Sequence, residues 1–150
     1  MMGAILIGLA GLAWILLFAD STVSPNKRAR LLIVEDEESQ LFTLTGLMEG
    51  EGFQVVGCPN ATEALEQVQH EDFDVAVVDQ RLPDLDGTQL LAKIKNMNGK
   101  VRVIINTAHG TLASAKEALN LGAFAYVEKA GDPGELIQQV HAGIKNARRQ

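Results

Sequence analysis

The sequence predicts an α/β domain with a doubly wound fold, in which helices cover both faces of a five-stranded parallel sheet. Five short, predominantly apolar runs alternate with segments of helical periodicity between residues 31 and 150. Parallel strands need helical crossovers, which are right-handed and therefore place helices on both faces. One apolar run, Val75–Val78, ends on a lone carboxylate, Asp79. Ligands bind at that edge of open parallel sheets, and five strands favour the flavodoxin-like order 2-1-3-4-5.

The predicted elements follow one another regularly. The strands are expected at Leu31–Val34, Phe53–Cys58, Phe73–Val78, Val101–Ile105 and Phe124–Val127. The expected apolar faces of the helices are Leu41, Leu44, Leu47 and Met48; Ala61, Ala64, Leu65 and Val68; Leu90, Leu91, Ile94 and Met97; Leu112, Ala115, Ala118 and Leu119; and Leu136, Val140 and Ile144. The helix within Thr111–Leu121 has mostly small apolar side chains, so we expect it to make few buried contacts.

Three of these helices have recognisable starting residues. An Asn or Asp at the N-cap accepts a backbone N–H bond, and a Glu or Gln three residues later can return one. The pairs are Asn60 with Glu63, Asp86 with Gln89, and Asp132 with Glu135. Pro133 then suits the first helical position, because its fixed φ angle is compatible with a helix.

Composition excludes several classes of protein. The chain has 150 residues, of which 47% are hydrophobic and 21% charged, and this permits one domain with a proper core. The net charge of −6 argues against general nucleic-acid binding, which needs a basic surface. The single cysteine, Cys58, excludes an internal disulfide and a cysteine-based zinc site, and we expect it to be a small core residue.

Carboxylates follow the first and third predicted strands. Glu35 and Asp36 come directly after Val34, and in the 2-1-3-4-5 order their strand lies beside the strand that ends at Asp79. Three carboxylates this close repel one another, and a hard divalent cation relieves the repulsion. Oxygen ligands of this kind favour Mg²⁺. The alternative is that the acidic run only provides a favourable first turn of a helix.

The fourth and fifth predicted strands bring further polar side chains to the same edge. Thr107 follows Ile105, and Lys129 follows Val127. A hydroxyl, an ammonium group and a carboxylate around a metal ion form a phosphoryl-transfer site. Taken singly, Thr107 could be an ordinary strand residue and Lys129 a solvated surface lysine. The inference depends on their joint placement with the acidic residues.

Four segments, LLIVEDEE, VVDQRLPDLDG, IINTAHG and GAFAYVEK, resemble a response-regulator receiver domain in order and spacing over about Ala29–Arg149. The resemblance implies that Asp79 is the phosphoacceptor. It implies that Mg²⁺ is bound by Asp36 directly, by Glu35, often through water, by Asp79 and by the backbone carbonyl of Arg81.

The resemblance also implies the roles of residues around the phosphoryl group. Thr107 would contact that group, Lys129 would pair with it, and Tyr126 would be an aromatic switch that turns inward when Thr107 moves. The family usually has a cis proline after the lysine, whereas this chain has Ala130. A non-proline cis bond is costly, so we expect a trans peptide there.

A receiver of this kind implies particular partners. They are a histidine kinase or a histidine phosphotransfer protein as phosphodonor, and a second copy bound through the helix at 111–121, the strand at 124–127 and the last helix. No nucleic-acid partner is expected. Such a protein catalyses only its own phosphorylation and dephosphorylation, so it is not expected to be an enzyme with a separate substrate.

Two rival functions remain open. A Mg²⁺-dependent phosphohydrolase would also use an aspartate nucleophile at a strand end, but it typically needs a second Asp two residues later, where this chain has Arg81. An interaction adaptor that is not phosphorylated would usually lack one of the acidic residues, and none is missing here. A flavin or dinucleotide domain is disfavoured because no glycine-rich turn follows the first strand.

The N-terminal segment predicts a separate role. Residues 1–19 carry no charge and are almost wholly apolar, which predicts a hydrophobic helix that anchors the chain in a membrane. Residues 20–28 would be a linker and residues 29–149 the receiver. Lys27, Arg28 and Arg30 follow the apolar segment, so the receiver would lie in the cytoplasm, tethered to the inner membrane. The alternative is a misread gene start, with translation beginning near Val23.

Overall fold

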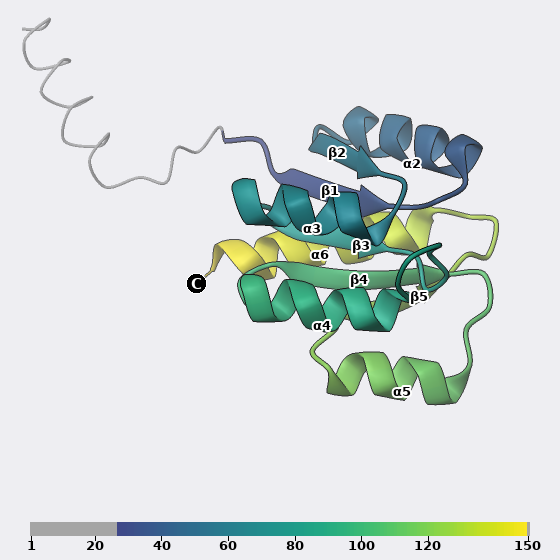
Figure 1. Ribbon diagram of the computed structural model, residues 1–150. Coiled ribbons are helices and arrows are strands. Elements are labelled where there is room, and N and C mark those ends of the chain that lie inside the picture. Colours follow the sequence, from purple (N-terminus) through teal and green to yellow (C-terminus); the bar gives the residue numbers. More distant parts are fainter. Residues whose placement is uncertain (1–26, 150) are drawn as a thin grey trace, which may run out of the picture.

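The computed structural model describes residues 27–149 and contains five strands and five helices in regular alternation. In chain order the elements are β1 (Arg30–Val34), α2 (Glu38–Gly50), β2 (Gln54–Cys58), α3 (Ala61–His70), β3 (Val75–Val78), α4 (Gly87–Met97), β4 (Arg102–Thr107), α5 (Leu112–Asn120), β5 (Ala125–Glu128) and α6 (Gly134–Arg148). All neighbouring strands pair in parallel, in the order β2-β1-β3-β4-β5 (Figure 1). The predicted fold class and strand order are therefore confirmed.

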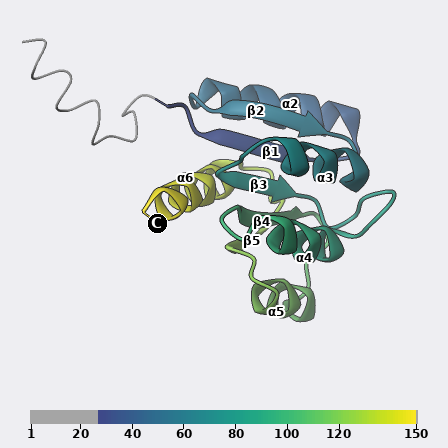
Figure 2. The ribbon, with the colours of Figure 1, turned by 60° about the vertical axis from the view of Figure 1, so that its left-hand side comes forward.

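The sheet separates two apolar layers. Alternate residues of the central strands point to opposite faces, because the side-chain period of a strand is two. In β1, Leu32 and Val34 pack with α3, α4 and Ala118 of α5, whereas Leu31 and Ile33 pack with α2 and α6. The ribbon shows the same two layers of helices on either side of the sheet (Figure 2). Helices therefore cover both faces, as the doubly wound fold requires.

The predicted helix starts are largely present. Asn60 accepts the backbone N–H of Glu63 at 2.8 Å, although no return bond from Glu63 is found. Asp86 and Gln89 form a complete capping box at the start of α4. The last helix differs, because Pro133 is its N-cap and Asp132 accepts the N–H of Gly134 from outside the helix.

Three predicted core residues lie at the surface. The exposed fractions are 74% for Leu112, 51% for Leu119 and 45% for Met97. Only Ala118 of α5 is buried, because this helix contacts the sheet mainly at the edge strand β5 and otherwise packs on α4. The prediction of an apolar face through Leu112 and Leu119 was therefore wrong, whereas the expectation that α5 makes few buried contacts is confirmed.

The predicted anchor helix at residues 1–19 and most of the linker at residues 20–28 lie outside the described residues. Among residues 27–149, no helix combines the length and the hydropathy that a membrane crossing needs. The division into anchor, linker and receiver stays a prediction.

Candidate functional site

The backbone aligns the ends of β1 and β3 before any side chain is considered. Val34 pairs with Val78, and the N–H of Asp79 donates to the carbonyl of Val34 at 3.0 Å. The N–H of Glu35 donates to the carbonyl of Cys58 at 3.0 Å, which extends the pairing of β1 with β2 by one residue. Asp79 and Glu35 therefore both leave the sheet at its carboxyl edge, on adjacent strands.

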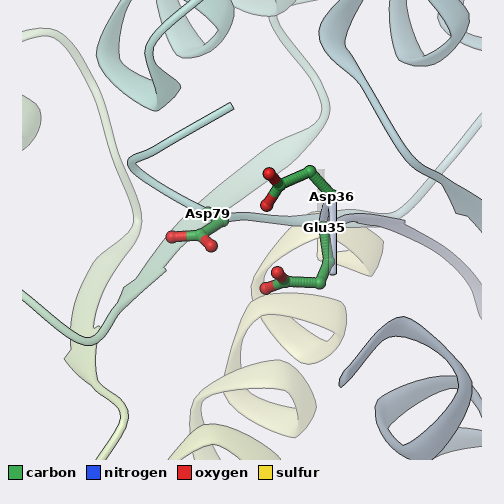
Figure 3. A group of neighbouring side chains, drawn as sticks. All are labelled: Glu35, Asp36 and Asp79. Atoms are coloured by element: carbon green, nitrogen blue, oxygen red, sulfur yellow. The ribbon is translucent and has the colours of Figure 1, made fainter. Parts of the chain in front are cut away.

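Three carboxylates meet at this edge. One oxygen each from Glu35, Asp36 and Asp79 lies within 4.8 Å of the others. Figure 3 shows the three carboxylate groups directed toward one common space. Charges of one sign at this separation repel, and a divalent cation with a preference for oxygen ligands would offset the repulsion. The donor set consists of carboxylates, with the backbone of Arg81 nearby, and so fits Mg²⁺.

Burial distinguishes the three carboxylates. Glu35 is buried with an exposed fraction of 4%, whereas Asp36 is exposed and Asp79 lies between them. Burial raises the pKa of Glu35, and the nearby charge of Asp79 raises it further, although the hydrogen bond from Lys129 acts in the opposite direction. The site therefore carries a carboxylate that is harder to ionise than an ordinary glutamate.

Lys129 compensates part of this negative charge. Its ammonium group donates to Glu35 Oε2 at 2.6 Å, to Asp79 Oδ2 at 3.1 Å and to Gln40 Oε1 at 2.8 Å. Burial alone would lower the pKa of Lys129, but its bonds to the two carboxylates outweigh burial and raise it. Lys129 is therefore held in its charged form beside the carboxylate of Asp79.

Two more of the predicted site residues line a recess that Glu35, Asp36, Asp79 and Lys129 also line. It measures about 190 Å³, and its walls include Arg81 and Thr107. Thr107 is the last residue of β4, is 1% exposed and accepts the backbone N–H of His109 at 3.2 Å. The N–H of Arg81 lies 3.4 Å from Asp79 Oδ1, so the backbone at this position turns around the carboxylate. Sequence placed these residues at one edge, and the structure brings them together.

Tyr126 lies on β5, which β4 separates from β3 and Asp79, and does not line the recess. Its half-buried side chain lies against the loop that joins β4 to α5. A methyl group added at Gly110 would fall 2.9 Å from Cε1 of the Tyr126 ring. The ring is therefore next to the segment that follows Thr107, the residue with which a switch would have to communicate.

The loop after β3 depends on a glycine that sequence reasoning did not single out. A Cβ atom at Gly87 would lie 2.4 Å from the carbonyl oxygen of Asp79, which leaves no room for any other residue. The N–H of Gly87 donates to the carbonyl of Gln80 at 2.8 Å. The first residue of α4 thus packs against the backbone of Asp79 and fixes the turn that follows it.

Asp84 fixes the same loop at its outer end. Its carboxylate accepts the backbone N–H groups of Ala61 and Thr62 at 2.9 and 2.8 Å, and also the hydroxyl of Thr62. These bonds hold the pKa of Asp84 low, at about 2. The start of α3 and the loop that carries Arg81 are therefore joined by one side chain.

Gln40 is the other contact that the sequence did not reveal. It lies in the first turn of α2, which begins shortly after β1 ends, and its carbonyl oxygen reaches Lys129. The sequence does contain one indication of this contact. Gln40 is a polar residue in the first turn of the helix that follows Glu35 and Asp36, so it lies close to the acidic cluster.

Comparison with known proteins agrees with this geometry. The family model of the response regulator receiver domain matches residues 31–141. Sporulation initiation phosphotransferase F of Bacillus subtilis is 33% identical over 111 residues, which cover 74% of this chain and 90% of the relative. Transcriptional regulatory protein GlrR of Escherichia coli is 32% identical over 122 residues, which cover 81% of this chain but only 28% of that longer protein.

Solved structures show the same fold. A CheY-like receiver domain from Methanospirillum hungatei has a TM-score of 0.78 at 30% identity, covering 82% of this chain and 98% of the other. The beryllofluoride-activated NtrC4 receiver domain, solved as a dimer, has a TM-score of 0.74 at 29% identity, covering 79% and 98%. Because the family model spans most of the chain and these relatives share its fold, the protein belongs to the family of response regulator receiver domains of two-component systems.

Proposed function

We propose that this chain is a phosphoacceptor of a two-component phosphorelay, which takes a phosphoryl group onto Asp79 with Mg²⁺ and then alters a protein-interaction surface. One observation carries the proposal. The carboxylate of Asp79 lies among two further carboxylates and accepts a hydrogen bond from Lys129. A nucleophilic carboxylate beside a cation and a candidate metal site is what phosphoryl transfer requires.

The proposed step forms one bond and breaks one. An oxygen of Asp79 attacks the phosphorus of a phosphohistidine, a P–O bond forms, the P–N bond breaks, and the leaving imidazole takes a proton. Mg²⁺ held by Glu35, Asp36, Asp79 and the Arg81 carbonyl would supply positive charge for the phosphoryl oxygens. Hydrolysis of the resulting acyl phosphate restores Asp79, so the protein acts on itself rather than on a separate substrate.

Two further side chains support this chemistry. Lys129 already donates a hydrogen bond to Asp79. The same N–H group can instead donate to an oxygen of a phosphoryl group attached to Asp79. The Thr107 hydroxyl lines the same recess, so it can donate to a second oxygen. Donors that are in position before the reaction stabilise the developing charge without reorganisation.

The proposed phosphodonor is a histidine kinase or a histidine phosphotransfer protein. The similarity to the sporulation initiation phosphotransferase of Bacillus subtilis supports a role in phosphoryl transfer. A donor of that kind needs a docking surface beside Asp79. On α2, two residues after Gln40 of the recess, Phe42 is 82% exposed and could meet an apolar side chain of the donor.

We also propose homodimerisation through α5, β5 and α6. The similar NtrC4 receiver was solved as an activated dimer, and α5 of this chain exposes Leu112 and Leu119. Phosphorylation would then control whether these exposed side chains find a partner.

The rival functions have weaker support. A phosphohydrolase with an Asp nucleophile would place an acid two residues further on, where the exposed Arg81 stands. An adaptor that is never phosphorylated would not need a lysine bonded to a central aspartate inside a cluster of carboxylates.

Labelling with a small phosphodonor tests the proposal. The full chain is incubated with radiolabelled acetyl phosphate and Mg²⁺, beside the variants Asp79→Asn and Asp74→Asn. The proposal predicts base-labile label on the wild type and on Asp74→Asn, whose aspartate lies at the opposite end of β3, and none on Asp79→Asn. Undiminished label on Asp79→Asn would refute it.

A further inference from the structure

Lys129 has three hydrogen-bond acceptors, and one of them is neutral. Two are the carboxylates of Glu35 and Asp79, and the third is the carbonyl oxygen of Gln40 at 2.8 Å. An ammonium group has three N–H donors, so these three acceptors satisfy it completely. Gln40 supplies the only one of the three that carries no charge and would not serve as a metal ligand in the proposed site.

The side chain of Gln40 is itself fixed. Its amide nitrogen donates to the carboxylate of Glu37, and the Ser39 hydroxyl donates to the same carboxylate at 3.1 Å. Both ends of the Gln40 amide therefore have partners, and this determines which end faces Lys129. A contact that is held at both ends restricts the ammonium group more than a free surface amide would.

The segment that carries Lys129 provides little restraint of its own. Ala130 is exposed, Gly131 has a positive φ of 76°, and α6 starts at Gly134 with no side-chain hydrogen bond from its N-cap, Pro133. The backbone of Lys129 is anchored by one bond, from its N–H to the carbonyl of Thr107 at 2.8 Å. Beyond that bond, the position of the ammonium group depends on its three side-chain partners.

Those partners change during the proposed reaction. A cation bound by Glu35 and Asp79 would compete with Lys129 for their oxygens, and phosphorylation would bond one oxygen of Asp79 to phosphorus in an acyl phosphate. Gln40 lines both the acidic recess and the neighbouring recess of about 350 Å³ between α2 and the loop after Lys129. Its bond to Lys129 is therefore independent of the groups that react, and it stands between the two recesses.

We infer that Gln40 is a positioning residue, which holds the Lys129 ammonium group at the reaction site while its carboxylate partners are engaged by the metal ion and the phosphoryl group. The inference rests on the proposed phosphoacceptor function and adds a residue to it. Gln40 acts through Lys129 and touches neither the phosphorus nor the metal ion.

A double-mutant cycle tests this inference. The variants are Gln40→Met, which keeps the length of the side chain without the amide, Lys129→Met, and the double variant, with Gln69→Met as the matched control. Gln69 is exposed on α3 and has no hydrogen bond from its side chain among the described residues. The measurements are the rate of phosphorylation by acetyl phosphate at saturating Mg²⁺ and the Mg²⁺ dissociation constant by calorimetry.

Gln40→Met should phosphorylate about tenfold more slowly than the wild type, which is the effect of losing one hydrogen bond to a charged group. In the Lys129→Met background the same change should have no further effect, because Gln40 acts only through that lysine. Mg²⁺ affinity should change less than about twofold. Gln69→Met should match the wild type.

Three results would overturn the inference: a wild-type rate for Gln40→Met, an equal slowing in both backgrounds, or a fall in Mg²⁺ affinity parallel to the fall in rate. These results differ from failure of the proposed function itself. In that case Asp79→Asn would still accept label, or Lys129→Met would react as fast as the wild type.

Discussion

The hydroxyl groups of Tyr126 and Ser114 share a hydrogen bond of 2.7 Å. Ser114 lies in the first turn of α5, where it also forms the capping box with Thr111. The ring on β5 is therefore tied to the start of α5, in which only Ala118 is buried. A movement of Tyr126 would break this bond and loosen the start of α5.

Phosphorylation should therefore change hydrogen exchange in α5 and β5. Helices with few buried contacts open easily, and a phosphoryl group that draws Thr107 toward it would vacate space for the Tyr126 ring. We expect exchange at the amides of 111–121 and 125–128 to differ between the free chain and the beryllofluoride-bound chain. The amides of α3 should serve as the unaffected reference.

Ser114→Ala provides a second check on the same switch. Loss of the hydroxyl should speed exchange in α5 of the free chain and bring it closer to the beryllofluoride-bound pattern. Identical exchange in α5 with and without beryllofluoride, with Asp79 shown to be occupied, would argue against the switch.

As the pH falls, Mg²⁺ binding should begin to weaken at a higher pH than it would with an ordinary glutamate ligand. Burial and the charge of Asp79 raise the pKa of Glu35 above its usual value of 4.5. At any pH below this raised pKa, a proton competes with the metal ion for the Glu35 carboxylate. Below it, the Mg²⁺ dissociation constant should rise by about tenfold per pH unit. Calorimetry across the acid range measures this.

Glu35→Gln is the control for the pH effect. This variant should bind Mg²⁺ more weakly at neutral pH, because it lacks one charged ligand, and its affinity should depend less on pH. An unchanged pH dependence in Glu35→Gln would assign the proton to another carboxylate.

Gly87→Ala should destabilise the chain through the backbone of Asp79. The added methyl group would overlap the Asp79 carbonyl and the Cα atom of Gln80, which lies 2.9 Å away. Overpacking of this kind costs about 1–3 kcal/mol of unfolding free energy. Gly46→Ala is the matched control, because nothing lies within 4 Å of its added methyl group and alanine favours the interior of α2. Urea unfolding that gives equal stability for both variants would contradict the account of this turn.

The sequence was sufficient for the sheet and for most of the site, for one physical reason. Apolar runs of strand length locate the parallel strands, and parallel strands end at a common edge, so Glu35, Asp79, Thr107 and Lys129 had to lie close together. Their proximity follows from topology and needs no knowledge of side-chain packing. Their roles stay predictions until they are measured.

Two of the features that the sequence did not reveal depend on how a helix is rotated about its axis. Leu112 and Leu119 have the spacing of a buried face, but α5 contacts the sheet mainly at β5, so they stay exposed. The contact from Gln40 to Lys129 likewise depends on which face α2 turns toward the loop after β5. Gly87 was missed because its need for space arises from the backbone of Asp79, which periodicity does not describe.

The hydrophobic N-terminal segment gives a prediction that is independent of the site. A helix of 19 residues is ~28 Å long, close to the ~30 Å hydrocarbon thickness of a bilayer. Cells that make the native gene should retain the protein in the membrane fraction, and deletion of residues 1–19 should release it. A protein that is recovered outside the membrane fraction and begins near Val23 would show that the segment is not translated.

The most direct test of the central claim is the location of the phosphoryl group itself. The chain is treated with acetyl phosphate in the presence or absence of Mg²⁺, then with borohydride, which reduces an aspartyl phosphate to homoserine, and the peptides are sequenced by mass spectrometry. The account predicts homoserine at position 79, formed only when Mg²⁺ is present, and aspartate at position 36 unchanged. Homoserine at another position, or at position 79 to the same extent without Mg²⁺, would contradict it.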